Sequence, residues 1–138
     1  MTHTIDIQHE LEQYVSTALW SSNADHLDPE GTGAGGSMED HFSMEDLAPE
    51  ALASMREDLT SFIDGADPAA VEFWQAELGA GQIGHDFWLT RNGHGAGFWD
   101  RFGGEQLGAK YGRHLTDEAR PYGSSDLYVG DDGRVYVS

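Results

Sequence analysis

Cysteine is absent from this sequence, and lysine occurs only once, at Lys110. Without cysteine the chain can form neither a disulfide nor a thiolate site for metal binding or redox chemistry, which fits a reducing cytoplasm. Basic residues are also scarce, because 7 Lys and Arg face 25 Asp and Glu, for a formal charge of −18. Since nucleic acids and anionic membranes both attract basic surfaces, this composition argues against direct binding to either.

Long apolar runs are missing too. No stretch approaches the roughly 18 apolar residues that a membrane span requires. The start, MTHTIDIQHELEQ, has neither the basic nor the apolar part of a signal peptide. We therefore expect a soluble, unsecreted protein of the cytoplasm. The 138 residues include 4 Trp, 5 Tyr and 6 Phe, too many aromatics for a disordered acidic chain. We expect a single folded domain over residues 1–138.

The acidic residues are concentrated toward the N-terminus. Residues 1–80 contain 17 acids and one base, Arg56, whereas residues 81–138 contain 8 acids and 6 bases. Such an asymmetry gives the surface field a direction, so that a positively charged partner is steered toward the N-terminal part. The alternative interpretation is that the acidity serves solubility or adaptation to high salt, which requires no partner.

Helical periodicity dominates the first part of the chain. Apolar side chains predict an amphipathic helix over about residues 5–21 and a second one from between Ser43 and Pro49 to about Gly65. A third helix is expected to begin with Asp67 as N-cap and Pro68 at its first position. Residues 22–42, which include GTGAGG, are acidic and glycine-rich and are expected to form a flexible loop that does not pack.

The second helix is predicted to have one acidic and one apolar face. At 100° per residue, its carboxylates fall within about 40° of one another, opposite the apolar side chains. The acidic face consists of Asp46, Glu50, Glu57 and Asp64. The apolar face consists of Leu52, Met55, Leu59, Phe62 and Ile63.

Strands are predicted in the second half of the chain. Residues 85–90 and 98–101 flank RNGHGAG, and Asn-Gly indicates a hairpin because both residues tolerate positive φ. With a two-residue turn at Asn92 and Gly93, the cross-strand pairs would be Phe87–Phe98, His85–Asp100 and Arg91–His94. A longer glycine loop would shift this register.

A second hairpin is predicted at residues 127–129 and 135–137, around a glycine-containing turn. It follows a helix over about residues 104–119, in which Gly108 and Gly112 would permit close approach to the sheet. Together these elements predict an α+β fold. N-terminal amphipathic helices would precede a small antiparallel sheet of two hairpins with an intervening helix.

Three segments carry a resemblance to a known group of proteins. They are MEDLAPEALASMREDLTSFI, HDFWLTRNGHGAGFWDRF and YGSSDLYVGDDGRVY, which together span about residues 43–137. They closely resemble an uncharacterised family of small proteins from tailed bacteriophages and prophages. The resemblance implies a viral or prophage source and action in the cytoplasm of the host cell. It implies no reaction, cofactor or partner.

The first predicted hairpin would gather the residues of a candidate site, namely His85, Arg91, His94, Asp100 and Arg101. Imidazoles beside carboxylates can form a metal site or a general acid–base pair, and arginines can hold an anion. The spacing matches no established metal-ligand pattern, however, and a cross-strand histidine–aspartate pair is commonly a structural hydrogen bond. The sequence therefore assigns no catalytic residue, no metal and no cofactor.

Two further interpretations of the same segment are less favoured. Gly93, Gly95 and Gly97 resemble a phosphate-binding loop, but a strand rather than a helix is expected to follow them. Trp88 and Trp99 could stack on nucleobases, whereas aromatics on two short strands are more typical of a sheet core. We therefore predict that these aromatic side chains are buried.

Binding is the function that these observations favour. An acidic phage-type protein could inhibit a host DNA-binding or defence protein by presenting a DNA-like negative surface to it. The partner would be a basic host protein, and the acidic face of the second helix would contact it. One alternative is a small enzyme or ligand-binding protein that uses the residues of the 85–101 hairpin. Another is a virion component or a salt-adapted structural protein whose charge has no partner.

Overall fold

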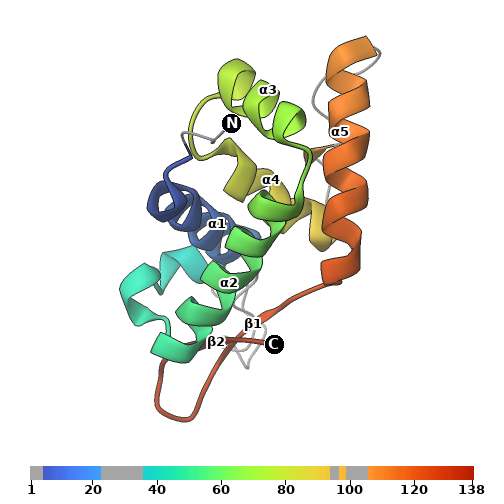
Figure 1. The fold of residues 1–138 in the computed structure, drawn as a ribbon. Helices are drawn as coiled ribbons and strands as arrows, with labels where there is room; N and C mark the ends of the chain where they lie inside the picture. The colour runs from blue at the N-terminus through green and yellow to red at the C-terminus, as the bar shows by residue number, and fades with distance from the viewer. Residues whose placement is uncertain (1–4, 23–35, 94–96, 99–105) are drawn as a thin grey trace.

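The computed structural model describes residues 5–22, 36–93, 97–98 and 106–138. Within these ranges the chain forms an α+β fold in which N-terminal helices precede a small antiparallel sheet (Figure 1). The α-helices are α1 (Ile7–Ser21), α2 (Pro49–Gly65), α3 (Pro68–Leu78), α4 (Gln82–Arg91) and α5 (Gln106–Ala119). Short 3₁₀ helices are η2 (Met38–Asp40), η3 (Met44–Asp46) and η5 (Arg120–Tyr122). The strands are β1 (Leu127–Val129) and β2 (Val135–Val137).

The first three α-helices confirm the sequence prediction, and local signals explain where they begin. The side chain of Asp6 caps α1 by accepting a hydrogen bond from the backbone N–H of His9 at 3.2 Å. Asp67 caps α3 in the same way, through the N–H of Ala69 at 3.0 Å, and Pro68 follows it as predicted. These carboxylates satisfy amides that have no partner within the helix.

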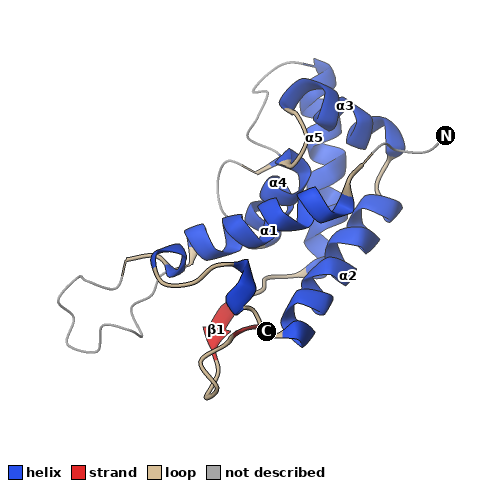
Figure 2. Ribbon diagram, turned by 90° about the vertical axis from the view of Figure 1, so that its left-hand side faces the viewer, coloured by secondary structure: helices blue, strands red, loops and turns tan. Residues whose placement is uncertain are grey.

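The interior is built around the crossing of α1 and α4, which lie side by side in Figure 2. Gly84 lies at this crossing, where an added Cβ would overlap with the carbonyl oxygen of Glu10. Aromatic rings fill the adjoining space, with the rings of Phe62 and Phe87 stacked at a centroid distance of 4.2 Å. Trp88 is buried, which confirms its predicted place in the core. Trp99 lies outside the described residues.

The first predicted hairpin is wrong, because residues 82–91 form helix α4 rather than a strand. His85 and Phe87 are helical, so the predicted strand pairings His85–Asp100 and Phe87–Phe98 do not form. The pair Asn92–Gly93 ends this helix instead of turning a hairpin. Gly93 has a φ of +73°, and its N–H donates to the carbonyl oxygen of Thr90 at 3.1 Å. A residue with positive φ just after a helix is a common helix end, and glycine is the residue that adopts it most easily.

Residues 36–42 pack on the helices, so the predicted flexible loop is wrong for this part. Met38 is only 1% exposed, and its backbone N–H donates to the carbonyl oxygen of Ser22 at 2.8 Å. These contacts hold η2 against the C-terminal end of α1. The remainder of the predicted loop, residues 23–35, lies outside the described residues.

The C-terminal hairpin confirms the sequence prediction at the predicted residues. Strands β1 and β2 are antiparallel, with Tyr128 opposite Tyr136. The described sheet therefore has two strands from one hairpin, and the predicted sheet of two hairpins is wrong. A bridge from Leu47 to Val135 and a 2.8 Å hydrogen bond from the N–H of Ala48 to the carbonyl oxygen of Val135 hold the hairpin at the start of α2 (Figure 1).

Helix α5 confirms the predicted helix between residue 106 and residue 119, but Gly112 packs against residues outside the sheet. Gly112 faces Phe98 and Trp74, and an added Cβ would lie 2.7 Å from the carbonyl oxygen of Phe98. In the described parts of the chain, no helix has both the length and the apolar character needed to cross a membrane.

Candidate binding surface

Helix α2 places three of the four predicted acidic residues on its outer face. Glu50, Glu57 and Asp64 are exposed. The opposite face is buried, as predicted, and includes Met55, Leu59, Phe62 and Ile63. The carboxylates are therefore anchored on a helix whose other side belongs to the core, which fixes their spacing.

Asp46 does not belong to this helical face. It lies in η3, before α2 begins, and its side chain accepts a 2.8 Å hydrogen bond from the backbone N–H of Ser43. The chain is extended at Leu47 and Ala48, so the helical angle used in the prediction does not apply to Asp46. Asp46 is nevertheless exposed, and its role is to close the turn that leads into α2.

The three α2 carboxylates carry charge that the described parts of the chain do not neutralise. The ion pairs formed there involve other acids, including Asp58 with Arg91, and none involves Glu50, Glu57 or Asp64. The nearby cation, Arg56, donates a 3.0 Å hydrogen bond to the side chain of Gln8. It shares a shallow hollow of about 440 Å³ with Glu57 and Asp64.

Further acids gather at the end of the molecule where α2 begins. Exposed carboxylates come from η3 (Glu45, Asp46), from the first turn of α2 (Glu50) and from the hairpin turn (Asp131, Asp132). The bonds of Ala48 and Leu47 to Val135 bring these segments together, although more than 80 residues separate them in the chain. The acidic surface is thus broader than the helical stripe that periodicity predicts. In the sequence, the two adjacent aspartates of the GDDG turn were the feature that could have indicated the acidic residues of the hairpin.

Arg91, a residue of the alternative site, is held inside the protein. Its guanidinium donates to the hydroxyl of Tyr14, to a carboxylate oxygen of Asp58 and to the carbonyl oxygens of Tyr122 and Gly123, each at 2.9 Å. Only 6% of its side chain is exposed. Burial by itself would lower the pKa of Arg91, but Tyr14 and Asp58 outweigh it and the pKa is raised. Arg91 therefore joins α4 to α1, α2 and the C-terminal segment.

His85, the second described residue of the alternative site, is paired with the carboxylate of the residue that follows it in the chain, Asp86. Its Nδ1 lies 2.8 Å from a carboxylate oxygen of Asp86, which is fully buried. Asp86 also accepts a 2.8 Å hydrogen bond from the indole N–H of Trp74 and a 2.9 Å hydrogen bond from the side chain of Gln82. One carboxylate thus ties α3 to α4 and orients the imidazole of His85.

The other residues of the alternative site cannot be placed beside His85. His94, Asp100 and Arg101 lie outside the described residues. An oriented imidazole can act as a general base, because the carboxylate fixes which ring nitrogen carries the proton. Within the described parts of the chain, no group of three or more His, Asp or Glu side chains is arranged to hold a metal ion.

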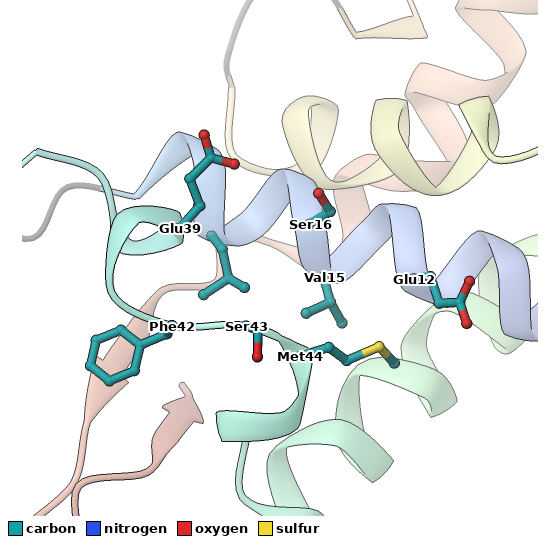
Figure 3. A pocket seen from close by; sticks show the side chains of 8 residues that line it. Glu12, Val15, Ser16, Glu39, Phe42, Ser43 and Met44 are labelled. Carbon is teal, nitrogen blue, oxygen red and sulfur yellow. The ribbon is translucent and has the colours of Figure 1, made fainter.

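A groove of about 380 Å³ lies between α1 and the 3₁₀ helices η2 and η3 (Figure 3). The side chains of Val15, Phe42 and Met44 give it an apolar surface, and Glu12 and Glu39 stand at its rim. The folding of residues 36–44 onto α1 creates this groove, which explains why the prediction of a loop at 22–42 missed it.

Comparison with known protein families, with curated proteins and with solved structures finds no match to this chain. Its function is therefore inferred from its own residues.

Proposed function

We propose that this chain is an acidic phage-type binding protein of the host cytoplasm, which presents a DNA-like negative surface to a basic host protein. The observation that carries the proposal is the exposed face of α2, where Glu50, Glu57 and Asp64 have no ion-pair partner among the described residues. The phage-type part of the proposal rests only on the sequence-based expectation drawn from the segments MEDLAPEALASMREDLTSFI, HDFWLTRNGHGAGFWDRF and YGSSDLYVGDDGRVY. The natural target of such a surface is a groove that otherwise holds DNA, in a host DNA-binding or defence protein.

The spacing of the carboxylates supports a mimic that uses more than one segment. Glu50, Glu57 and Asp64 follow one another at seven-residue intervals, which corresponds to about 10 Å along the axis of α2. Duplex DNA carries one charge per roughly 1.7 Å, so α2 alone is a sparse imitation. The carboxylates of η3 and the hairpin turn increase the density at the start of α2. We therefore propose that the centre of the binding surface lies at the start of α2.

The direct test compares this surface with a matched control. The test variant combines Asp46→Asn, Glu50→Gln, Glu57→Gln and Asp64→Asn, which keeps the side-chain volumes and removes four charges. The control variant removes four charges elsewhere, through Glu72→Gln and Glu77→Gln on α3 and Asp117→Asn and Glu118→Gln on α5. Both variants and the wild type are immobilised and exposed to host lysate at low and at high salt.

The proposal expects the wild type and the control to retain a basic nucleic-acid-binding protein at low salt and to release it at high salt. The test variant should retain much less, mainly because association slows when the steering field weakens. DNA added to the wild-type complex should displace the captured protein, since both would occupy the same groove. Equal capture by the test variant, or capture that DNA does not affect, would refute the proposal.

A second candidate function follows from the pair formed by His85 and the buried Asp86. A small enzyme could use this oriented imidazole as a general acid or base. The variant His85→Gln distinguishes the two functions, because it removes the imidazole and leaves the acidic surface intact. If the protein acts by binding, the variant should capture the partner as well as the wild type does and keep its biological effect. If the protein acts as an enzyme, the folded variant should still capture the partner but lose its biological effect.

A further inference from the structure

Two stacked tyrosine rings lie on one face of the C-terminal hairpin. Tyr128 and Tyr136 are cross-strand partners, with ring centroids 5.7 Å apart and ring planes 20° from parallel. Tyr128 is 50% exposed, although most large side chains of the described chain are buried. Since aromatic burial is strongly favourable, a half-exposed ring stacked on a partly buried one offers an aromatic surface to a binding partner.

The rings form the wall of a hollow of about 390 Å³, which the hairpin turn completes with Gly130, Asp131 and Asp132. The ring of Tyr136 lies directly on the backbone of Gly130, where an added Cβ would be 2.5 Å from the ring. The hydroxyl of Tyr136 donates to a carboxylate oxygen of Asp132 at 2.7 Å. The other oxygen of Asp132 accepts from the backbone N–H of Arg134 at 3.0 Å. These contacts fix the positions of Tyr136 and Asp132 in the hollow.

Negative charge outweighs positive charge around this hollow. Asp131 is exposed, and no ion pair engages it within the described ranges. Asp132 is held in place by the two hydrogen bonds just described, and Glu50 at the start of α2 is close enough to interact electrostatically with Tyr136. The opposing charge is the guanidinium of Arg134. Two carboxylates, those of Asp131 and Asp132, thus line the hollow beside the aromatic rings.

We propose that this hollow binds an arginine side chain of the basic partner, an inference that rests on the binding function proposed above. A guanidinium is planar, so it can stack on the ring of Tyr128 while its N–H groups donate to the carboxylate of Asp131. An ammonium group can approach the same carboxylate but lacks the flat surface and the paired donors. The hairpin would thus add an aromatic anchor to a surface that otherwise attracts its partner by charge alone, in the manner of tyrosine–arginine contacts at interface centres.

The test uses two peptides of equal charge, acetylated hexa-arginine and acetylated hexa-lysine, titrated into the full-length protein by calorimetry. We expect hexa-arginine to bind more tightly by about two- to fivefold for each arginine that occupies the hollow, which is the affinity equivalent of an exposed cation–π contact. NMR shifts of the backbone amides of Tyr128 and Asp131 should follow the hexa-arginine titration. Equal affinities for the two peptides would overturn the proposal.

Four variants locate the preference. Tyr128→Leu keeps an apolar side chain on the strand and should abolish the preference for arginine, with the melting temperature as a check on folding. Asp131→Asn should weaken the binding of both peptides, and Arg134→Ala should strengthen it because the opposing charge is gone. The fourth variant, Glu57→Gln with Asp64→Asn, changes residues of α2 that lie away from the hairpin. It should lower the affinity for both peptides equally.

The variants also separate the arginine site from the function on which it rests. A Tyr128→Leu variant that still prefers hexa-arginine overturns the arginine site, while the loss of affinity in the α2 variant still supports an acidic binding surface. Conversely, an α2 variant with full affinity counts against the acidic face, whatever the hairpin variants do.

Discussion

The guanidinium of Arg91 is buried and connects α4 with three other parts of the chain. The side-chain hydrogen bonds that its guanidinium donates go to helices α1 and α2 and to the segment after α5. A guanidinium suits this role because its planar donors can satisfy several acceptors at once. The residue type could be read from the sequence, but the acceptors are 31 to 77 residues away along the chain.

Substitution of Arg91 should therefore destabilise the fold. In Arg91→Ala, Asp58, Tyr14 and two carbonyl groups lose their donor, and we expect the free energy of unfolding to fall by about 2–4 kcal/mol, as for partly buried charged networks. Urea denaturation measures the change. Arg134→Ala is the control, because its exposed side chain should contribute less than about 0.5 kcal/mol. A loss in Arg91→Ala no larger than in this control would contradict the structural role.

Tyr14 should make the stability depend on pH in the alkaline range. Burial raises the pKa of Tyr14 from 10.0 to about 12, although the neighbouring Arg91 acts in the opposite direction. Below pH 10.0 the phenol is protonated in both the folded and the unfolded chain, so its contribution is complete there. Above this pH the unfolded chain releases the proton first, and stability falls, by up to about 2–3 kcal/mol near pH 12.

The variant Tyr14→Phe isolates this effect from other groups that titrate in the same range. It removes the hydroxyl that accepts from Arg91, so its stability at neutral pH should be lower by about 1–3 kcal/mol. Its further loss of stability between roughly pH 9 and pH 11 should be smaller than that of the wild type. Parallel pH profiles for the two proteins would be inconsistent with the raised pKa.

At the scale of elements, helix α4 marks the limit of prediction from sequence. The run HDFWLT contains the aromatic and β-branched residues that favour strands, and Asn-Gly favours a hairpin turn. Asn-Gly also favours a helix end, because the same positive φ serves both structures. Tertiary packing decides between them, since α4 is buried on nearly all sides and its apolar residues have no helical stripe to reveal it.

Gly84 provides a test of the α1–α4 crossing. In an isolated helix Gly84→Ala would be favourable by about 1 kcal/mol, but here the methyl group meets the backbone of Glu10. We expect a net loss of stability of about 1–3 kcal/mol, measured by thermal or urea unfolding. Gly65→Ala is the matched control, because nothing lies within 4 Å of an added Cβ there. Stabilisation by both substitutions would contradict the close crossing.

Elements with local signals were predictable from the sequence. The caps at Asp6 and Asp67, the proline that begins α2 and the alternation in the C-terminal hairpin all act within a few residues. The part of the candidate site on α2 was predictable for the same reason, because a helix of known phase fixes which side chains face outward. The part of the candidate site on the hairpin was not predictable, because its position beside α2 depends on the bridge between Leu47 and Val135.

At the scale of the whole molecule, the charge of −18 acts against the compact state. Like charges repel, and the repulsion decreases with ionic strength as counterions screen it. We therefore expect the melting temperature to rise when salt is added. The variant with Asp46→Asn, Glu50→Gln, Glu57→Gln and Asp64→Asn should melt higher than the wild type at low salt and should gain less from added salt.

This measurement also bears on the interpretation that the acidity is an adaptation to salt. A protein that folds fully only at high salt, and captures no partner at low salt, would favour adaptation over binding. If the protein is stable at low salt, adaptation to salt does not explain why the acidic residues gather on one surface. That result would favour the binding function. A melting temperature that falls with added salt would contradict the repulsion itself.

Glu10 has a consequence for the order in which the chain folds. Its buried carboxylate accepts hydrogen bonds from the backbone N–H groups of Gly81 and Gly84, so α1 supplies the cap that α4 lacks in its own sequence. The partners are 71 and 74 residues apart, and closing so long a loop is slow. A peptide of residues 79–93 should therefore be mostly unstructured in water. In the intact chain, α4 should become stable only when α1 docks against it. The variant Glu10→Gln should therefore affect mainly a late step of folding, so that it accelerates unfolding more than it slows folding.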